Sequence, residues 1–273
     1  MIINVHGHDA YCYTGGKTFN PELPTAVFIH GAQNDHSVWA LQSRYFAHHG
    51  FSVLAVDLPG HGRSKGEALD KVEAMAGWLL ALLDAASVKS AMLFGHSMGS
   101  LIALEACSLE ASQKGNARVK KIGLIGTAYP MKVSDLLLNA ARDDEQSAID
   151  MVNIWQHSSI AQKPSCPGPG FYVMGASRRL MQRMSAINTK QLFFTDFTAC
   201  NNYSNGEKAA ANVQCPTLFV LAKNDMMTPP KASALISKII IHSKTVMLDN
   251  CGHSMMSEQP DALLNALIAF ART

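Results

Sequence analysis

The chain has 273 residues, which is enough for one large domain or for a domain with an inserted subdomain. Basic and acidic residues nearly balance, 23 against 21, so the formal net charge is only +2 and no basic surface of the kind that binds nucleic acid is indicated. There is no run of about eighteen apolar residues, so the sequence predicts no membrane span.

Short apolar runs alternate with longer stretches of helical periodicity along most of the chain. Residues 2–13 predict an antiparallel edge hairpin that turns at residues 6–9. Near-continuous apolar runs predict buried strands of a parallel sheet at residues 25–30, 51–57, 90–94, 119–125 and 217–222, with a weaker run at 244–248. Helical patterns lie between these strands, at residues 67–86, 101–107, 231–239 and 260–270.

One segment interrupts this alternation. Between residues 128 and 207 there is no convincing core strand, and helical patches occur instead at residues 134–141, 146–156, 177–184 and 189–201. The run Pro-Ser-Cys-Pro-Gly-Pro-Gly at residues 164–170 must be irregular. We therefore predict an α/β fold with a mostly parallel, doubly wound sheet formed by residues 1–127 and 208–273, and a helical cap, or lid, formed by residues 128–207.

The pentapeptide Gly95-His96-Ser97-Met98-Gly99 lies between a short apolar strand and a helix that opens at Met98. A strand that turns sharply into a helix brings the two backbones close together, which favours Gly95 and Gly99 because glycine has no Cβ. Ser97 would then stand at the apex of the turn, above the helix N-terminus, with its hydroxyl exposed. This placement is typical of a nucleophilic serine.

A serine nucleophile needs a base to take its proton and a carboxylate to orient that base. Asp225 follows the apolar strand 217–222 and His253 follows the strand 244–248, so both are predicted at carboxyl ends of strands, as is Ser97. The chain order serine, acid, histidine is one that serine triads use. We therefore assign Ser97 as the nucleophile, Asp225 as the acid and His253 as the base.

Other acidic residues and histidines are less well placed. Asp57 precedes a turn and is interpreted as a structural residue near Arg63, and Asp249 is too close to His253 in sequence to reach behind its ring. His36 is expected at a helix start. Surface or edge positions are expected for His6, His8, His48, His49, His157 and His242.

Main-chain amides can stabilise the negative oxygen that forms when Ser97 attacks a carbonyl. Gly31 follows the strand 25–30 and lets the backbone bend, so that the amide of Ala32 points into the site. The amide of Met98, at the helix N-terminus, is its predicted partner in an oxyanion hole. His30 is expected to shape this loop.

These motifs occur in order over nearly the whole chain outside the predicted cap. They are His30-Gly31 with Trp39, Asp-Leu-Pro-Gly-His-Gly-Arg-Ser at residues 57–64, the pentapeptide around Ser97, Asn224-Asp225 with Pro229, and Gly252-His253 with Glu258 and Pro260. The set resembles the α/β-hydrolase superfamily. It is most similar to the capped branch of small-molecule esterases, lactonases, haloperoxidase-like enzymes and meta-cleavage-product (carbon–carbon) hydrolases.

The resemblance implies a serine hydrolase, of carboxylesterase type, that cleaves a small ester or related acyl substrate through an acyl-enzyme. Ser97 argues against dehalogenases and epoxide hydrolases of this fold, which carry aspartate there. A carbon–carbon hydrolase is an alternative, although His96 and Ser100 depart from the asparagine and second glycine that such enzymes often carry. Arg178 or Arg179 would then be candidates for binding a dienoate. A non-catalytic ligand receptor is the alternative from another class.

The expected partner is a small apolar molecule, because methionines cluster in the cap and near the catalytic loops and adapt to varied ligand shapes. No cofactor is required, and no histidine pair has the spacing of a zinc site, so no metal is expected. The six cysteines have no C-x-x-C spacing and are expected to be reduced and mostly buried. Residues 1–5 lack a signal-peptide pattern, so we expect a cytoplasmic location. The sequence indicates no oligomeric state.

Overall fold

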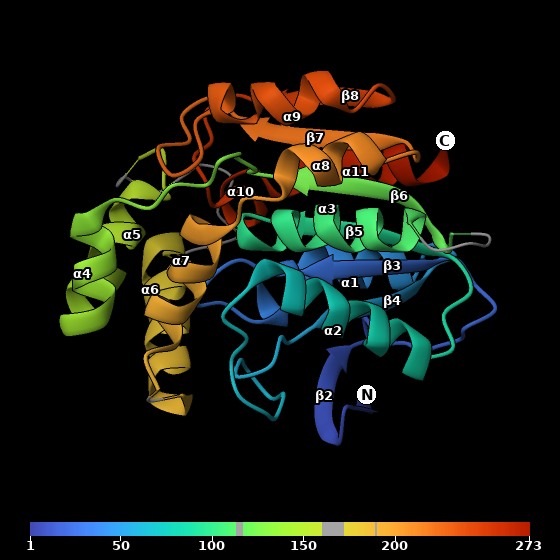
Figure 1. Cartoon of the computed structure of the whole chain (residues 1–273), viewed down its shortest axis with the longest axis horizontal. Coiled ribbons are helices and arrows are strands. Elements are labelled where there is room, and N and C mark those ends of the chain that lie inside the picture. The colour runs from blue at the N-terminus through green and yellow to red at the C-terminus, as the bar shows by residue number, and fades with distance from the viewer. Residues whose placement is uncertain (113–116, 160–171, 189) are drawn as a thin grey trace.

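The computed structural model describes residues 1–112, 117–159, 172–188 and 190–273 (Figure 1). Its eight strands form one sheet in the order β1-β2-β4-β3-β5-β6-β7-β8. Strand β2 pairs antiparallel with β1 and β4, and the other neighbouring strands pair in parallel, which confirms the mostly parallel, doubly wound sheet. The strands are β1 (Ile2–Val5), β2 (His8–Tyr13), β3 (Thr25–Ile29), β4 (Ser52–Val56), β5 (Ala91–His96), β6 (Val119–Ile125), β7 (Thr217–Ala222) and β8 (Ser243–Leu248).

Helices cover both faces of the sheet (Figure 1). One face carries α2 (Val72–Ala85), α3 (Met98–Ala111), α8 (Gly206–Asn212) and α9 (Ala234–Ile239). The other carries α1 (Ala40–Ala47) and α11 (Pro260–Arg272). Shorter elements are η1 (His36–Trp39), η2 (Pro230–Ser233) and α10 (Met255–Glu258).

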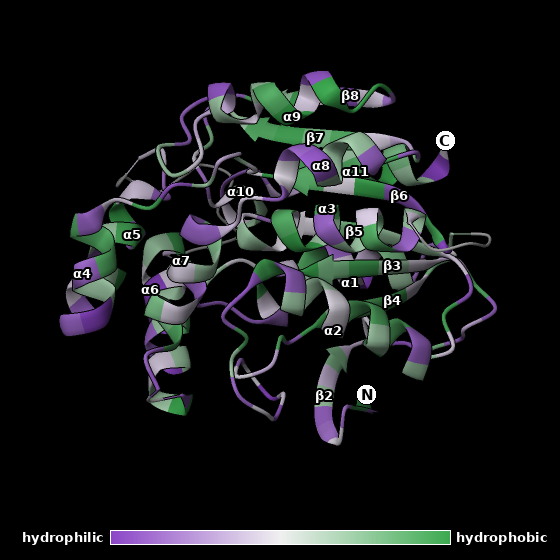
Figure 2. Ribbon diagram, viewed as in Figure 1, coloured by the Kyte–Doolittle hydropathy of each residue, from purple (hydrophilic) through white to green (hydrophobic). Residues whose placement is uncertain are grey.

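The central strands owe their apolar sequences to this double cover. Strands β3, β4, β5 and β7 are buried along their whole length, so neither face of these strands can carry exposed polar side chains. Figure 2 shows β7 as a continuous hydrophobic arrow within the layers. Strand β8 forms the edge of the sheet and is partly exposed, which explains why its apolar pattern is weaker.

Several helix boundaries differ from the predictions, and one helix was not predicted. Helix α2 begins at Val72 rather than at residue 67, because Lys71 is extended and Val72 is the first residue whose side chain is buried against the core. Helix α8 was not predicted, and it runs across the expected boundary at residues 207 and 208. It packs against α3 and α9 and therefore belongs to the core layer.

Helices α4 (Asp135–Asp143), α5 (Glu145–Trp155), α6 (Val173–Ile187) and α7 (Leu192–Asn202) lie beyond the carboxyl ends of the strands, at the left of Figure 1. They correspond to the four helical patches expected there. They share a small apolar cluster of their own, formed by Leu137, Ala141, Ala148, Ile149, Val152, Met181, Phe193 and Phe197. The irregular run expected at residues 164–170 lies outside the described residues. Among those that are described, no helix is long and apolar enough to cross a membrane.

Candidate active site

Ser97 lies at a sharp turn between β5 and α3. Its backbone has φ 53° and ψ −120°, and its amide donates to the carbonyl oxygen of Ile125 at 2.9 Å. The side chain is partly exposed, although the residues on both sides of it are buried. A Cβ on Gly95 would overlap the carbonyl group of Gly99, and one on Gly99 would overlap that of Ile29. The two glycines are therefore required by close backbone approach, as expected from the pentapeptide.

The structure brings Asp225 and His253 together across the ends of β7 and β8. Nδ1 of His253 lies 2.8 Å from Oδ2 of Asp225, and both side chains are buried. Burial alone would raise the pKa of Asp225. The charge and hydrogen bond of His253, together with the amide and hydroxyl of Thr228, outweigh burial and lower this pKa. Asp225 is therefore favoured as a carboxylate, which accepts a hydrogen bond from the Nδ1 N–H of His253.

Thr228 is a site residue that the sequence analysis missed. Its hydroxyl oxygen lies 2.8 Å from Oδ2 of Asp225, 3.0 Å from Nδ1 of His253 and 2.9 Å from the carbonyl oxygen of Gly126. Its amide and that of Met227 donate to Oδ1 of Asp225 at 2.8 and 2.9 Å. The carboxylate is thus held at both oxygens. The sequence feature that could have indicated this role is the position of Thr228, three residues after Asp225 and directly before two prolines.

His96 holds the main chain and packs against the ring of His253. Its Nε2 donates to the carbonyl oxygen of His253 at 2.9 Å, and the two rings lie 4.6 Å apart. Burial, followed by the charge of His253, lowers the pKa of His96 to about 3. His96 is therefore neutral, with its proton on Nε2, and it fixes the main chain at His253 without competing as a base.

The loop after β3 lies next to Ser97. A Cβ on Gly31 would stand 3.1 Å from Cβ of Ser97, so this glycine provides room beside the serine, and its φ does not lie in the left-handed region. Nε2 of His30 accepts from the amide of Leu58 at 3.2 Å, so Nδ1 carries the proton and donates to the carbonyl oxygen of Gly31 at 2.8 Å.

That hydrogen bond also sets the direction of the Ala32 amide. The Gly31 carbonyl and the Ala32 N–H belong to the same planar trans peptide and point in opposite directions. Burial lowers the pKa of His30 to about 4, which keeps the ring neutral and the donor in place. His30 therefore holds the peptide group that carries one of the predicted oxyanion donors.

A cavity of about 200 Å³ opens beside Ser97. It lies between the loop after β3, the segment after β7 and the helices α4, α5 and α7. Its lining is mainly apolar: Ala32, Met131, Val133, Leu137, Trp155, Phe197, Cys200, Met226 and Met227, together with Ser97, Lys132, Ser134 and Thr228. Three methionines therefore reach the cavity, whereas Met98, Met181, Met184 and Met255 are core residues. Lys132 alone is charged among the described lining residues.

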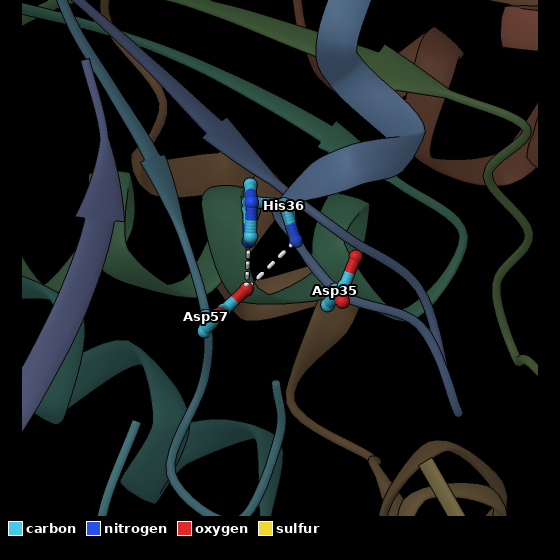
Figure 3. Close-up of side chains that lie close together, drawn as sticks. All are labelled: Asp35, His36 and Asp57. Carbon is cyan, nitrogen blue, oxygen red and sulfur yellow. Dashed lines mark hydrogen bonds and ion pairs between the residues drawn. The ribbon is translucent and has the colours of Figure 1, made fainter. Parts of the chain in front are cut away.

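Asp57 has a structural role that excludes it as the triad acid. Its Oδ1 accepts from the amide and Nδ1 of His36 at 2.8 and 2.7 Å, and its Oδ2 accepts from the amide of Arg63 at 2.8 Å (Figure 3). His36 begins η1, as expected. Asp35, beside them, accepts from the side chain of Arg183 and from the first turn of η1. The potential metal-ligand atoms of Asp35, His36 and Asp57 lie within 4.8 Å of one another, but each carboxylate oxygen already accepts a hydrogen bond.

Three further expectations concern His157, the cysteines and Asp249. His157 is buried rather than exposed, and its Nδ1 contacts the carbonyl oxygen of Asn153 at 2.7 Å. Of the five described cysteines, Cys12, Cys107, Cys200 and Cys251 are buried, and Cys215 is partly exposed; Cys166 lies outside the described residues. Asp249 pairs with Lys223 at the surface and does not reach the site.

These features define the class of the protein. Residues 26–266 match the model of the alpha/beta hydrolase family, and the chain belongs to this family.

Relatives and solved structures of this family cover nearly the whole chain. It is 26% identical over 266 residues to the pimeloyl-[acyl-carrier protein] methyl ester esterase of Nitrosospira multiformis, with 92% of this chain and 95% of that protein covered. It is 23% identical over 257 residues to the (E)-2-((N-methylformamido)methylene)succinate hydrolase of Acinetobacter baylyi, with 90% of each covered. The enol-lactonase of Burkholderia xenovorans LB400 has the same fold, with a TM-score of 0.80 and 20% identity over the full length of both chains.

Proposed function

We propose that this hydrolase is a serine esterase that cleaves small carboxylic esters with an apolar acyl group. The observation that carries the proposal is the apolar cavity that Ser97 lines together with Thr228, whose hydroxyl contacts both members of the buried Asp225–His253 pair. The relatives support the reaction class, because two proteins that resemble this chain are named as a methyl ester esterase and as a hydrolase of a substituted succinate.

The chemistry follows from the positions of the side chains. Asp225 holds the Nδ1 proton of His253, so Nε2 is free to take the proton of Ser97 as its oxygen attacks the carbonyl carbon. The amides of Ala32 and Met98 stabilise the oxyanion. His253 then protonates the alcohol that leaves, and water enters by the same route to release the acid and regenerate Ser97.

We further propose that residues 128–207 act as a cap that selects the substrate. Leu137, Trp155 and Phe197 come from three helices of this segment, and each lines the cavity beside Ser97. An apolar acyl chain would leave water for this lining, whereas a charged chain would lose hydration, and among the described lining residues Lys132 is the one charged side chain that could offset the loss. A preference for uncharged acyl groups follows.

Two other readings are less well supported. A dienoate substrate of a carbon–carbon hydrolase requires cationic groups near the nucleophile. Arg178 instead pairs with Asp150 at 2.6 Å, and neither Arg178 nor Arg179 lines the cavity. Lys132 is the one cation in the described lining, and its Nζ donates to the carbonyl oxygen of Asn201 at 3.0 Å. A receptor would retain its ligand after at most one slow turnover.

The test uses p-nitrophenyl esters from acetate to decanoate with the wild type and with Ser97→Ala. We expect a burst close to one equivalent, steady turnover in the wild type, and loss of both in the variant, with an unchanged melting temperature. Turnover that persists in Ser97→Ala would refute the proposal. A folded wild type that shows no burst would favour a carbon–carbon hydrolase acting on dienoates. A single turnover that leaves the product bound would indicate a receptor.

A further inference from the structure

We propose that Asp196, in the helix α7 of the cap, is a positioning residue that holds the oxyanion loop in its working conformation. The inference rests on the proposed esterase function, because it assigns a task to Asp196 in that reaction. It follows from a buried junction at which one carboxylate oxygen contacts both His61 and Gln33, the residue directly after Ala32.

The junction is buried from solvent. Oδ2 of Asp196 accepts from Nε2 of His61 at 2.9 Å and from the amide of Gln33 at 2.9 Å. The exposed fractions of Asp196, His61 and Gln33 are 0%, 1% and 0%. These residues are separated by 135 and 163 positions from Asp196, so the contact joins the cap to two core loops.

The charge of the junction is also defined by its hydrogen bonds. Nδ1 of His61 lies 3.0 Å from the carbonyl oxygen of Pro59, and Nε2 faces Asp196, so both ring nitrogens meet acceptors and both must donate. Burial lowers the pKa of His61, but Asp196, the Pro59 carbonyl and the more distant Asp57 raise it above its usual value. His30, whose ring lies 4.8 Å away, is neutral. His61 is therefore a cation that balances the buried carboxylate.

Gln33 is held by the cap at more than its amide. Its side-chain Nε2 donates to Oε1 of Glu145 in α5 and to Oγ of Ser185 in α6, each at 2.8 Å. Its φ of 57° lies in the left-handed region that non-glycine residues rarely occupy, so these contacts are needed to retain the conformation. One loop residue thus binds three helices of the cap.

The consequence reaches the oxyanion donor. The peptide after Ala32 is fixed at both ends, because its N–H donates to Asp196 and its carbonyl accepts from Nδ2 of Asn34 at 2.9 Å. The peptide before Ala32 is fixed by His30. Because the peptide groups on both sides of the Ala32 Cα are held, the N–H of Ala32 keeps a single direction. Loss of the Asp196 acceptor releases the N–H end of the peptide after Ala32 and leaves only Asn34 to hold its carbonyl end, and the amide of Ala32 then points at the oxyanion for only part of the time.

The test is a matched pair of double variants, Asp196→Asn with His61→Gln and Asp196→Ala with His61→Gln. Both remove the two buried charges together, so neither leaves an unpaired ion. They differ in whether residue 196 offers an acceptor to the Gln33 amide. We expect kcat to be about tenfold or more lower in the alanine pair than in the asparagine pair, with KM within a factor of two, because a misplaced oxyanion donor weakens only the transition state.

A second readout separates positioning from general loosening. A trifluoromethyl ketone forms a tetrahedral adduct with the serine and fills the oxyanion hole, so its inhibition constant should rise by the same factor as kcat falls. Asp150→Asn, which breaks an exposed ion pair in the cap, is the control and should change neither value. Equal kcat and equal inhibition constants in the two double variants would overturn the inference. A wild type without turnover would instead overturn the proposed function.

Discussion

Gly126 offers a direct test of the proposed catalytic role of His253, because it restricts the position of that ring. This residue follows β6, has φ 57°, and lies against the rings of both His253 and His96. A Cβ at this position would stand 3.1 Å from Cε1 and 3.2 Å from Nδ1 of His253, and 3.4 Å from Nε2 of His96. These separations are below the optimal carbon–carbon distance of about 3.5–4.0 Å, so Gly126→Ala must displace the ring.

Two effects can be estimated separately. An alanine in the left-handed region costs about 1–2 kcal/mol of folding stability, whatever surrounds it. Relief of the contacts moves His253 by a fraction of an ångström, and because a displacement of about 1 Å costs on the order of a hundredfold in rate, we expect a loss of about tenfold in kcat. KM should change little, since the cavity lining is untouched.

The assay compares Gly126→Ala with Gly7→Ala in p-nitrophenyl ester turnover and in urea unfolding. Gly7 also has a positive φ, 85°, but a Cβ there meets nothing within 4 Å. Both variants should lose similar stability, and only Gly126→Ala should lose kcat. The reasoning is refuted if Gly126→Ala retains wild-type kcat, or if Gly7→Ala loses as much.

Four further predictions concern pH, the site and the cavity. The pKa values of His30 and His96, about 4 and about 3, lie below the value of about 6.5 in the unfolded chain, so the unfolded state binds more protons as the pH falls below that value. The contribution of these two neutral rings to the free energy of unfolding is complete above pH 6.5. It is lost as the pH falls, by about 1.4 kcal/mol per pH unit for each ring. Equal free energies of unfolding in urea at pH 6.5 and pH 5.0 would contradict this prediction. Thr228→Val should lower kcat about tenfold through loss of a hydrogen bond to charged groups, while Thr228→Ser should retain most of it in the same assay. Trp155→Ala should enlarge the cavity and move the preferred acyl chain to greater length, and an unchanged chain-length profile would argue against the assigned pocket. Dialysis against EDTA should leave kcat unchanged, since the predicted steps use protein groups alone.

The parts of the structure that were predicted correctly are those with a local sequence cause. Strands β3, β4, β5 and β7 are covered on both faces and carry continuous or nearly continuous apolar runs. The turn at Ser97 demands two glycines that any reader of the chain can find. Asp225 and His253 could be placed because parallel strands bring their carboxyl ends to one edge, so the end of each strand is a position in space as well as in sequence.

The parts that escaped prediction depend on contacts between distant segments. Nothing near Asp196 indicates that its partners are His61 and Gln33, and the protonation of His61 follows only from which atoms surround it. The sequence neighbours of His157 are mostly polar, as at a surface, yet His157 is buried in the folded chain. Helix α8 is only seven residues long, too short for periodicity to distinguish it from a loop.

The backbone of Ser97 has a consequence for the evolution of the protein. A non-glycine residue at φ 53° and ψ −120° lies outside the favoured regions, and such strain costs on the order of 1–3 kcal/mol, which the surrounding core must offset. Replacement of this serine by glycine would release the strain and remove the nucleophile in one step. Mutation at this codon can therefore yield a chain that is more stable but inactive, and only selection for turnover opposes that outcome.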